Sequence, residues 1–453
     1  MPSIRVFAGD ENGLTKSIKF VIPEGRLRAD TVITTSVVTV DERPSSGKVQ
    51  RMSVGQGPNA AKLLAVGRSG GNISLHSYRP RTDEIESKQE WNETRFNSED
   101  AFIGLNVGSR GTYSCTTRGF LRLKSFGTDV GSSEDAPETS SQTTVLPMRL
   151  KDWRLSPSET HFVYGGDEVE VSLWDIEKAF SEPVKASEEA INSGRKRKER
   201  KDKVKLLHGE VWRAQNVPHD FLNIRQPVHN TALSFIHQGS TTSDSHNVIA
   251  AGTAAGAVRL YDVRSHRKPI QNWDKVCRNS GVKHIQCGRL EHQLFVSDSQ
   301  SSVYTIDIRN GRTTYRYPNA KGAVVSLAPA PHEFLFSVSL DHFIRLYTTP
   351  PPPAKANQNQ PAKGKLVHEE YLKGTPSVVV WDALSGLGKD SNAKKKTWEE
   401  KNAREAEDED EIWNNMEVTD ARQDEEASSN ESQETDEDSE DEDNSRVKRL
   451  RAS

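Results

Sequence analysis

Residues 252–264, GTAAGAVRLYDVR, decide the fold. A turn that contains Gly256 leads into a short segment, beginning at Val258, in which apolar and polar side chains alternate. This pattern is typical of a β-strand that buries one face. Six further segments of the same kind occur along the chain, each after a turn rich in Gly, Asp or Ser. The seven segments begin at Leu14, Ile73, Phe120, Val171, Val258, Val303 and Ile344.

The spacing of these segments predicts a ring of small sheets. Successive starts are separated by 59, 47, 51, 87, 45 and 41 residues. A propeller blade of four strands needs about 40–45 residues, with longer gaps where loops are inserted. A two-sheet sandwich is the alternative, but sandwiches do not repeat at this period over so long a stretch. We therefore predict an all-β, seven-bladed β-propeller over residues 1–384.

Such a ring must close, because a single blade would leave its sheet face and edges exposed. We expect the strand near residues 4–7 and the late apolar segment 377–382, SVVVWD, to lie in the same or adjoining blades. The best preserved units resemble WD repeats. Two of them end their predicted third strand at Trp174-Asp175 and Tyr261-Asp262. Another carries Asp341 in the turn where such repeats usually have an aspartate.

Two insertions and a tail depart from the repeat. The longest gap contains residues 181–230, and residues 348–365, TTPPPPAKANQNQPAKGK, predict a solvated loop between the last two strands. Residues 385–453 form a tail that we expect to be mostly disordered, because apolar residues thin out there. Within it, residues 405–443 hold twenty Asp and Glu against one Arg, a net charge of −19. Since the last ten residues carry +4 and the whole chain −4, residues 1–404 carry +11.

Neither the opening MPSIRVFAGD nor any later window has the apolar run of a secretory signal or of a membrane span, so we expect a soluble intracellular protein. Its cysteines, Cys115, Cys277 and Cys287, suit a reducing compartment. Cys277 and Cys287 flank His284, but ten-residue spacing is not a zinc pattern, and we expect buried free thiols.

Catalytic motifs fail on their structural context. Residues 67–71, GRSGG, match a nucleophile motif, yet a strand follows where a helix is needed, so a turn is predicted. Gly388-Lys389 resembles a phosphate loop, but Asp390 stands where Ser or Thr must bind magnesium. We predict no catalytic residue, no metal and no cofactor.

Residues 195–205, RKRKERKDKVK, form a dense basic run. Such a run gains affinity for phosphate backbones by releasing counterions, and without aromatic residues any RNA contact would not depend on sequence. A nuclear-import signal or a solvated loop are the alternatives. The cationic residues are Arg195, Lys196, Arg197, Lys198, Arg200, Lys201, Lys203 and Lys205. The terminal cluster predicts import and comprises Arg446, Lys448, Arg449 and Arg451.

Residues 211–228, VWRAQNVPHDFLNIRQPV, mix apolar and polar side chains in a way that a passive linker would not need. We expect Trp212, Phe221, Leu222 and Ile224 to hold an ordered excursion against the ring while polar residues face outward. The alternative is a fourth strand followed by a loop. The partner-docking candidates here are Trp212, Arg213, Asn216, Asp220 and Arg225.

An apolar island interrupts the acidic tail at residues 411–418, where Ile412, Trp413 and Met416 would share one face of a helix. Such a helix could dock into a partner's groove, steered by the flanking acids. Accidental composition is the alternative.

Three motifs carry a resemblance to a known family. They are the W-R-A-x-N-V-x-x-D-F-L-x-I-R-x-P segment from Trp212, the L-x-H-x-x-Y-L-K segment (Leu366, His368, Tyr371, Leu372, Lys373) and the D-E-I-W of the tail. With the opening GDENGLTK, they resemble the family of WD-repeat protein seventy-four, called Nop-seven-associated protein one in fungi. The likeness spans nearly the whole chain, but the basic run is not carried over as a family feature.

The resemblance implies a non-enzymatic scaffold, located in the nucleus and nucleolus, for assembly of the large (60S) ribosomal subunit and processing of its rRNA. It further implies pre-ribosomal proteins and rRNA as partners, removal by an AAA-type ATPase like valosin-containing protein, and association with the nuclear exosome's RNA helicase. Because the fold alone does not select partners, a ubiquitin-ligase substrate receptor or a chromatin reader is the main alternative. A hydrolase on a propeller scaffold is a weaker one.

Overall fold

A computed structural model describes most of the chain up to Leu384. The described ranges are 3–22, 33–40, 47–79, 84–126, 140–181, 206–219, 221–236, 247–277, 280–317, 321–360 and 362–384. The chain divides into two compact units, Met1–Gly386 and Leu387–Ser453, and all described residues belong to the first.

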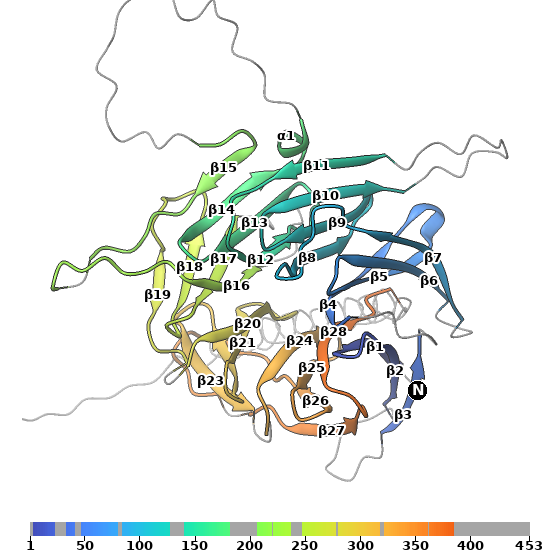
Figure 1. Cartoon of the computed structure of the whole chain (residues 1–453). Helices are drawn as coiled ribbons and strands as arrows, with labels where there is room; N and C mark the ends of the chain where they lie inside the picture. Colours follow the sequence, from blue (N-terminus) through green and yellow to red (C-terminus); the bar gives the residue numbers. More distant parts are fainter. Residues whose placement is uncertain are drawn as a thin grey trace, which may run out of the picture. The chain divides into compact units, whose positions relative to one another are not determined.

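The described residues form seven antiparallel sheets of four strands each, set around a common centre (Figure 1). One short helix, α1 (Ile176–Phe180), and one 3-10 turn, η1 (Pro58–Ala60), complete the regular elements of these ranges. From the innermost strand outward, the sheets are β28 (Pro376–Trp381), β1 (Ser3–Asp10), β2 (Thr15–Val21), β3 (Thr34–Thr39); β4 (Val49–Gln56), β5 (Lys62–Arg68), β6 (Asn72–Tyr78), β7 (Ile85–Asn92); β8 (Phe102–Val107), β9 (Gly111–Thr116), β10 (Phe120–Ser125), β11 (Ser141–Val145); β12 (Leu150–Leu155), β13 (His161–Gly166), β14 (Val169–Asp175), β15 (Glu210–Arg213); β16 (Asn230–Phe235), β17 (Val248–Thr253), β18 (Val258–Asp262), β19 (Gln271–Trp273); β20 (Val282–Cys287), β21 (Gln293–Asp298), β22 (Val303–Asp307), β23 (Arg312–Tyr317); β24 (Val324–Ala330), β25 (Phe334–Ser339), β26 (Phe343–Thr348) and β27 (Leu366–Tyr371).

The ring closes where the two ends of this unit share a sheet. β28 pairs with β1, with Phe7 opposite Val380 and Val6 opposite Trp381. The innermost strands then contact one another in a closed circle, in the order β28, β4, β8, β12, β16, β20, β24 and back to β28. The predicted closure and the predicted seven-bladed β-propeller are thereby confirmed.

Each of the seven predicted segments lies at the third strand of a different sheet: β2, β6, β10, β14, β18, β22 and β26. As expected, β14 ends with Trp174-Asp175 and β18 ends with Tyr261-Asp262. Asp341 lies in the turn before β26, where its carboxylate accepts hydrogen bonds from Ser339 and Arg345. The segment 67–71 is likewise the turn from β5 to β6.

One backbone hydrogen bond recurs in all seven described sheets. In each, an N–H in the turn between the second and third strands donates to a carbonyl in the connector that enters the sheet, at 2.8–3.0 Å. We call the side of the ring that carries these turns and connectors the connector face. The bonds are Glu11 to Thr375, Ser69 to Lys48, Thr117 to Ala101, Asp167 to Arg149, Ala254 to His229, Ser299 to Gly281 and Leu340 to Ala323.

Every innermost strand also carries a bulge near its start, which leaves one residue without a partner opposite. Three bulge residues bond the innermost strand of the next blade through their side chains. Gln50 accepts from the Phe102 N–H, Thr231 donates to the Val282 carbonyl, and Ser377 donates to the Val49 carbonyl. The bulges therefore join neighbouring blades close to the centre of the ring.

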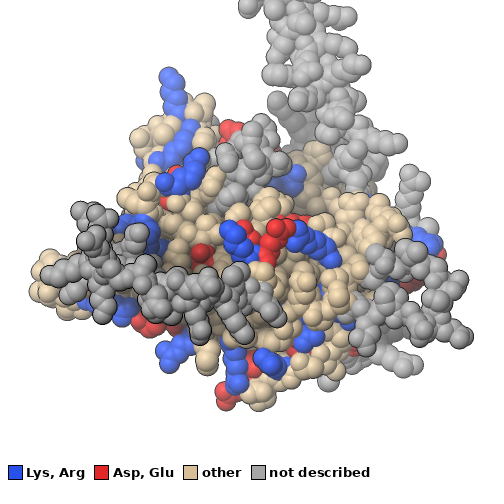
Figure 2. Space-filling view, turned by 90° about the horizontal axis from the view of Figure 1, so that it is seen from above, with Lys and Arg blue, Asp and Glu red and all other residues tan. Residues whose placement is uncertain are grey.

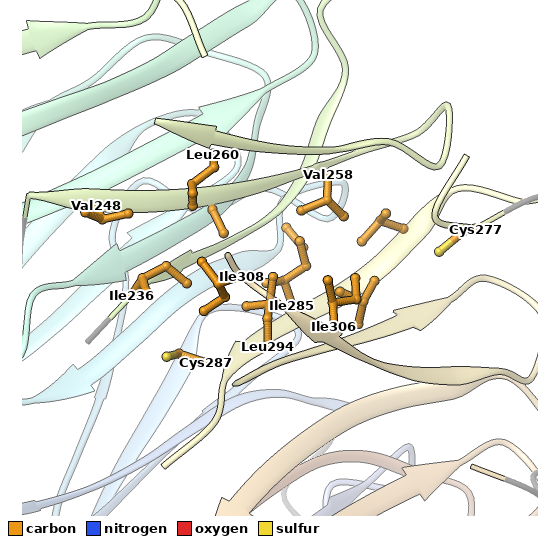
Figure 3. Close-up of a cluster of buried hydrophobic side chains, with 14 residues drawn as sticks. Ile236, Val248, Val258, Leu260, Cys277, Ile285, Cys287, Leu294, Ile306 and Ile308 are labelled. Atoms are coloured by element: carbon orange, nitrogen blue, oxygen red, sulfur yellow. The ribbon is translucent and has the colours of Figure 1, made fainter. Parts of the chain in front are cut away.

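Apolar side chains from facing sheets fill the space between blades. Figure 3 shows one such cluster, in which Val258 and Leu260 of β18 lie opposite Ile285, Leu294 and Ile306 of the next blade. Fully burying an apolar side chain of this size contributes about 1.5–3 kcal/mol. Cys277 and Cys287 belong to the same cluster, and both are free thiols as predicted.

The Pro-rich segment 348–365 connects other strands than predicted. It connects β26 to β27, the third and fourth strands of one blade, and not the last two strands of the chain. It is also bonded to the neighbouring blade, because Arg309 donates to the Pro353 carbonyl at 2.6 Å and the Tyr315 hydroxyl to the Pro350 carbonyl at 3.1 Å. Proline lacks an N–H but keeps its carbonyl as an acceptor, so a run of prolines can still be fixed by donors from outside.

Candidate protein-docking site on the connector face

The predicted docking segment begins in β15, the fourth strand of its sheet, and leaves it on the connector face. Trp212 is only 7% exposed and packs edge-on against Tyr261 of the next blade, with ring centroids 5.7 Å apart. The segment thus supplies the fourth strand of the alternative interpretation. A docking role for Trp212 stays a prediction, and its burial argues that it supports the following loop from beneath.

Arg213 is held by a buried carboxylate. Its Nε donates to Glu210 at 2.6 Å and its Nη2 contacts the second Glu210 oxygen. Glu210 in turn accepts from the Ser172 hydroxyl at 2.6 Å, and Ser172 accepts from the Trp174 indole. The hydrogen bond to Glu210 raises the pKa of Arg213. Arg213 therefore stabilises the sheet through Glu210, and this carboxylate neutralises its charge where the loop begins.

We call residues 214–229, between β15 and β16, the docking loop. Its polar side chains fix it to itself and to the ring. The Asn216 side chain donates to the Gln226 carbonyl at 2.6 Å and closes the loop at its base. Arg225 pairs with Glu168 in the β13–β14 turn at 2.8 Å, and the Gln215 N–H donates to the Arg267 carbonyl. The docking candidates Asn216 and Arg225 thus hold the loop in place, and Asp220 lies outside the described residues.

Three apolar side chains in the middle of the loop are exposed to solvent. Phe221 is 94% exposed, Leu222 62% and Ile224 57%. The expectation that these three side chains pack against the ring is wrong. Polar groups attach the loop instead: Arg225 pairs with Glu168, and the Gln215 N–H donates to the Arg267 carbonyl. Large apolar side chains exposed side by side on an anchored loop are characteristic of interaction sites.

The charges around the loop are largely paired. Asp167 accepts from Lys151 at 3.1 Å and contacts His229 at 3.2 Å, beside the Arg225–Glu168 pair. Although burial alone would raise it, these hydrogen bonds lower the pKa of Asp167. On the face seen in Figure 2, Lys and Arg side chains occur in small separate groups, with acidic side chains among them.

The remaining predicted residues fall outside the described ranges. They are the cationic side chains of the basic run, the tail island with Ile412, Trp413 and Met416, and the terminal basic cluster. The described chain stops at Ser181, after α1, and resumes at Leu206, before β15. The basic run and the docking loop are therefore attached to opposite ends of β15, although they share one gap in the sequence.

Sequence reasoning missed a group of polar side chains that line cavities at the centre of the ring. The third residue after the bulge is polar in five of the seven described innermost strands: Ser53, Asn106, Arg154, Ser234 and Gln286. All five line these cavities. These inner strands contain other polar residues as well, and the bulges that determine which of them face the centre are not visible in the sequence.

Two negative findings concern only the described part of the chain. No three His, Cys, Asp or Glu side chains there are grouped so as to hold a metal ion. No helix there has the length and apolar character that crossing a bilayer requires.

No family model matches the chain. Over 281 residues it is 24% identical to a WD repeat-containing protein of Dictyostelium discoideum, covering 62% of this chain and 42% of that protein. Over 169 residues it is 25% identical to the ribosome biogenesis protein NSA1 of Meyerozyma guilliermondii, covering 32% of this chain and 41% of the relative. The chain thus spans about two fifths of the length of each relative. It is a WD-repeat β-propeller whose distant relatives include a ribosome biogenesis protein.

Proposed function

We propose that this chain is a non-enzymatic scaffold in biogenesis of the large ribosomal subunit. It acts in the nucleolus on the precursor particles in which rRNA is processed. The similarity to NSA1 supports the process, and the propeller supports the scaffold role, because rigid rings of this kind present several faces to partners. The observation that carries the proposal is the docking loop, an anchored segment with an exposed Phe221 at its tip.

The chemistry of the loop favours a protein partner with an apolar pocket. Aromatic side chains that enter such pockets supply much of the binding energy at protein interfaces. RNA is recognised through unpaired cations and stacked aromatic residues. Arg213 before the loop and Arg225 within it are already paired with Glu210 and Glu168, and Arg267 donates to the carbonyls of Arg213 and Ala214. Phe221 and its aliphatic neighbours are the large exposed apolar groups of the loop.

Further partners rest on the family resemblance. We propose that an AAA-type ATPase of the valosin-containing-protein kind releases the chain from the particle, with Ile412, Trp413 and Met416 as a docking peptide. The nuclear exosome's RNA helicase is a second proposed partner. The basic run 195–205 would contact rRNA or direct nuclear import, and the terminal basic cluster would direct import.

The test uses tagged full-length chain, density-gradient sedimentation and identification of co-migrating proteins. Wild type should migrate with large-subunit precursors. The double variant Phe221→Ala, Leu222→Ala should shift most of the chain to the free fractions, while Val37→Ala, Val38→Ala, exposed apolar residues on β3, should behave as wild type.

Three outcomes would contradict the proposal. Co-migration of wild type with ubiquitin-ligase or nucleosome complexes would indicate an adaptor of another class. Equal loss in both double variants would indicate a general effect of surface apolarity. Loss of crosslinked RNA from the loop variant with all proteins retained would indicate that Phe221 binds RNA.

A further inference from the structure

Two overlapping cavities lie at the centre of the ring, with volumes of about 360 and 310 Å³. Both are bounded by side chains of the innermost strands, and they share Arg51 of β4, Asn106 of β8, Arg154 of β12 and Gln286 of β20. Cavities of roughly 300–1,000 Å³ with a few converging polar groups are the usual size of small-molecule sites.

Two guanidinium groups from different blades converge here. Arg51 is fixed by its Nε, which donates to the Ile103 carbonyl at 2.9 Å, and by its Nη1, which donates to the Gln50 carbonyl at 3.3 Å. Its Nη2 lies 3.9 Å from Asp152. Arg154 donates to Asp152 through Nε at 3.2 Å. Arg51 and Arg154 therefore share one carboxylate, which leaves an excess of positive charge.

Asp152 and His284 act as positioning residues for Arg154. The Asp152 carboxylate also accepts from the backbone N–H groups of Leu233 and Trp153, at 2.7 and 3.1 Å, so its oxygens are engaged within the wall. Nη2 of Arg154 lies 3.3 Å from Nε2 of His284. Since a guanidinium can only donate, Nε2 is the acceptor and the imidazole is neutral. Both contacts orient the guanidinium of Arg154. Only Asp152 opposes its charge, because the imidazole of His284 is neutral.

The two arginines repel each other, and a bound anion would relieve that repulsion. Burial lowers the pKa of Arg51, Asp152 opposes that effect, and the like charge of Arg154 lowers it again. Burial and the charges of Arg154 and Arg51 also lower the pKa of His284 well below its usual range, so the imidazole stays neutral. Glu159 borders only the larger cavity, where its Oε2 accepts from the N–H and hydroxyl of Ser109 at 2.7 and 2.6 Å, and no acidic side chain is among the described residues that line the smaller cavity.

We propose that the central cavity binds a small phosphorylated molecule. Guanidinium forks match phosphate oxygens in geometry and charge, and Arg51 and Arg154 would contact the phosphate from two sides. The side-chain amides of Asn106 and Gln286, which border both cavities, supply neutral donors for the rest of the ligand. A volume of about 360 Å³ admits one such molecule and excludes an RNA duplex. The site is independent of the docking loop.

The test measures binding of inorganic pyrophosphate to purified full-length chain by calorimetry and by the shift in Tm. Wild type should bind and gain thermal stability with rising pyrophosphate. Arg51→Gln and Arg154→Gln should each weaken binding at least about tenfold, the effect of losing one charge-assisted contact. Arg79→Gln is the matched control, because Arg79 pairs with the exposed Glu84 after β6 and borders neither cavity, and it should bind as wild type.

Gln286→Ala gives a second measurement if an arginine variant does not fold, and it should weaken binding about threefold. The proposal is overturned if wild type does not bind pyrophosphate at millimolar concentration, or if the control loses as much affinity as the cavity variants. A ten-nucleotide single-stranded RNA is tested in the same way. If this RNA binds through Arg154 and pyrophosphate does not bind, the ligand of the cavity is RNA and not a small phosphorylated molecule.

Discussion

Asp341 and Arg345 illustrate at the residue scale how charge is accommodated inside a blade. Arg345 is 1% exposed, and it donates to Asp341 at 2.6 Å and to the Ser339 hydroxyl at 2.7 Å. The aspartate could be anticipated from the WD-repeat pattern in the turn before β26. Its partner could not, because an arginine in an alternating strand is equally compatible with the solvent-facing side.

This pair predicts a pH dependence of stability. Burial alone would raise the pKa of Asp341, but the hydrogen bond from Arg345 outweighs it and the pKa is lowered. A carboxyl whose pKa is depressed in the folded state contributes stability above its unfolded pKa of about 4 and loses that contribution as the pH falls through its folded value. Asp341→Asn should therefore be less stable by about 1–3 kcal/mol at pH 7, and the difference from wild type should narrow below pH of about 4.

Urea unfolding at a series of pH values measures both effects. Glu177→Gln is the control, since Glu177 and its partner Arg110 are exposed and such pairs contribute at most about 1 kcal/mol. A difference between Asp341→Asn and wild type that stays constant down to pH 3 would show that the Asp341 charge does not stabilise the fold.

At the scale of elements, the third strands were predictable and the outer strands were not. Third strands such as β18 carry a clear apolar signal because they lie between neighbouring blades, where four of the five residues of β18 are buried. The outer strand β7, IESKQEWN, is exposed along most of its length and β19 has three residues, so neither carries a burial pattern. The docking loop was located from its mixed composition, but the sequence could not show whether polar or apolar side chains would contact the ring.

Trp212 and Phe221 belong to the same segment, but we expect their replacement by alanine to change the free energy of unfolding by very different amounts. Trp212→Ala removes a buried ring that packs on Tyr261, and it should lower the free energy of unfolding by about 3–5 kcal/mol. Phe221→Ala removes an exposed ring and should change it by less than about 0.5 kcal/mol. Denaturant unfolding of the two variants decides the matter, and similar losses would mean that the loop tip is packed in solution.

At the scale of the whole molecule, closure followed from a physical requirement rather than from a motif. Open blades leave unpaired edges, so both ends of an extended array had to be joined. The repeated turn-to-connector bond and the bulges had no counterpart in the sequence, because they are made by backbone groups of unrelated residues. The central cavity was not anticipated either, because the bulges determine which side chains of the innermost strands face it.

The closing strand predicts a sharp length requirement for folding. A chain that ends at residue 384 keeps β28 and should unfold cooperatively, with a Tm close to that of the full chain. A chain that ends at residue 375 lacks β28, leaves β1 unpaired on one edge, and should aggregate or unfold without cooperativity. Calorimetry and size-exclusion chromatography distinguish the two, and a well-folded shorter chain would show that β28 is dispensable.

The pairing of β1 with β28 also has a consequence during translation. β1 is made before β28, and its sheet cannot be completed until Trp381 has left the exit tunnel. At synthesis rates of about 5–20 residues per second, that delay is on the order of 20–80 s. During this time the edge of β1 can pair with a neighbouring nascent chain. We therefore expect the protein to depend on chaperones that cover β1 until β28 has been made.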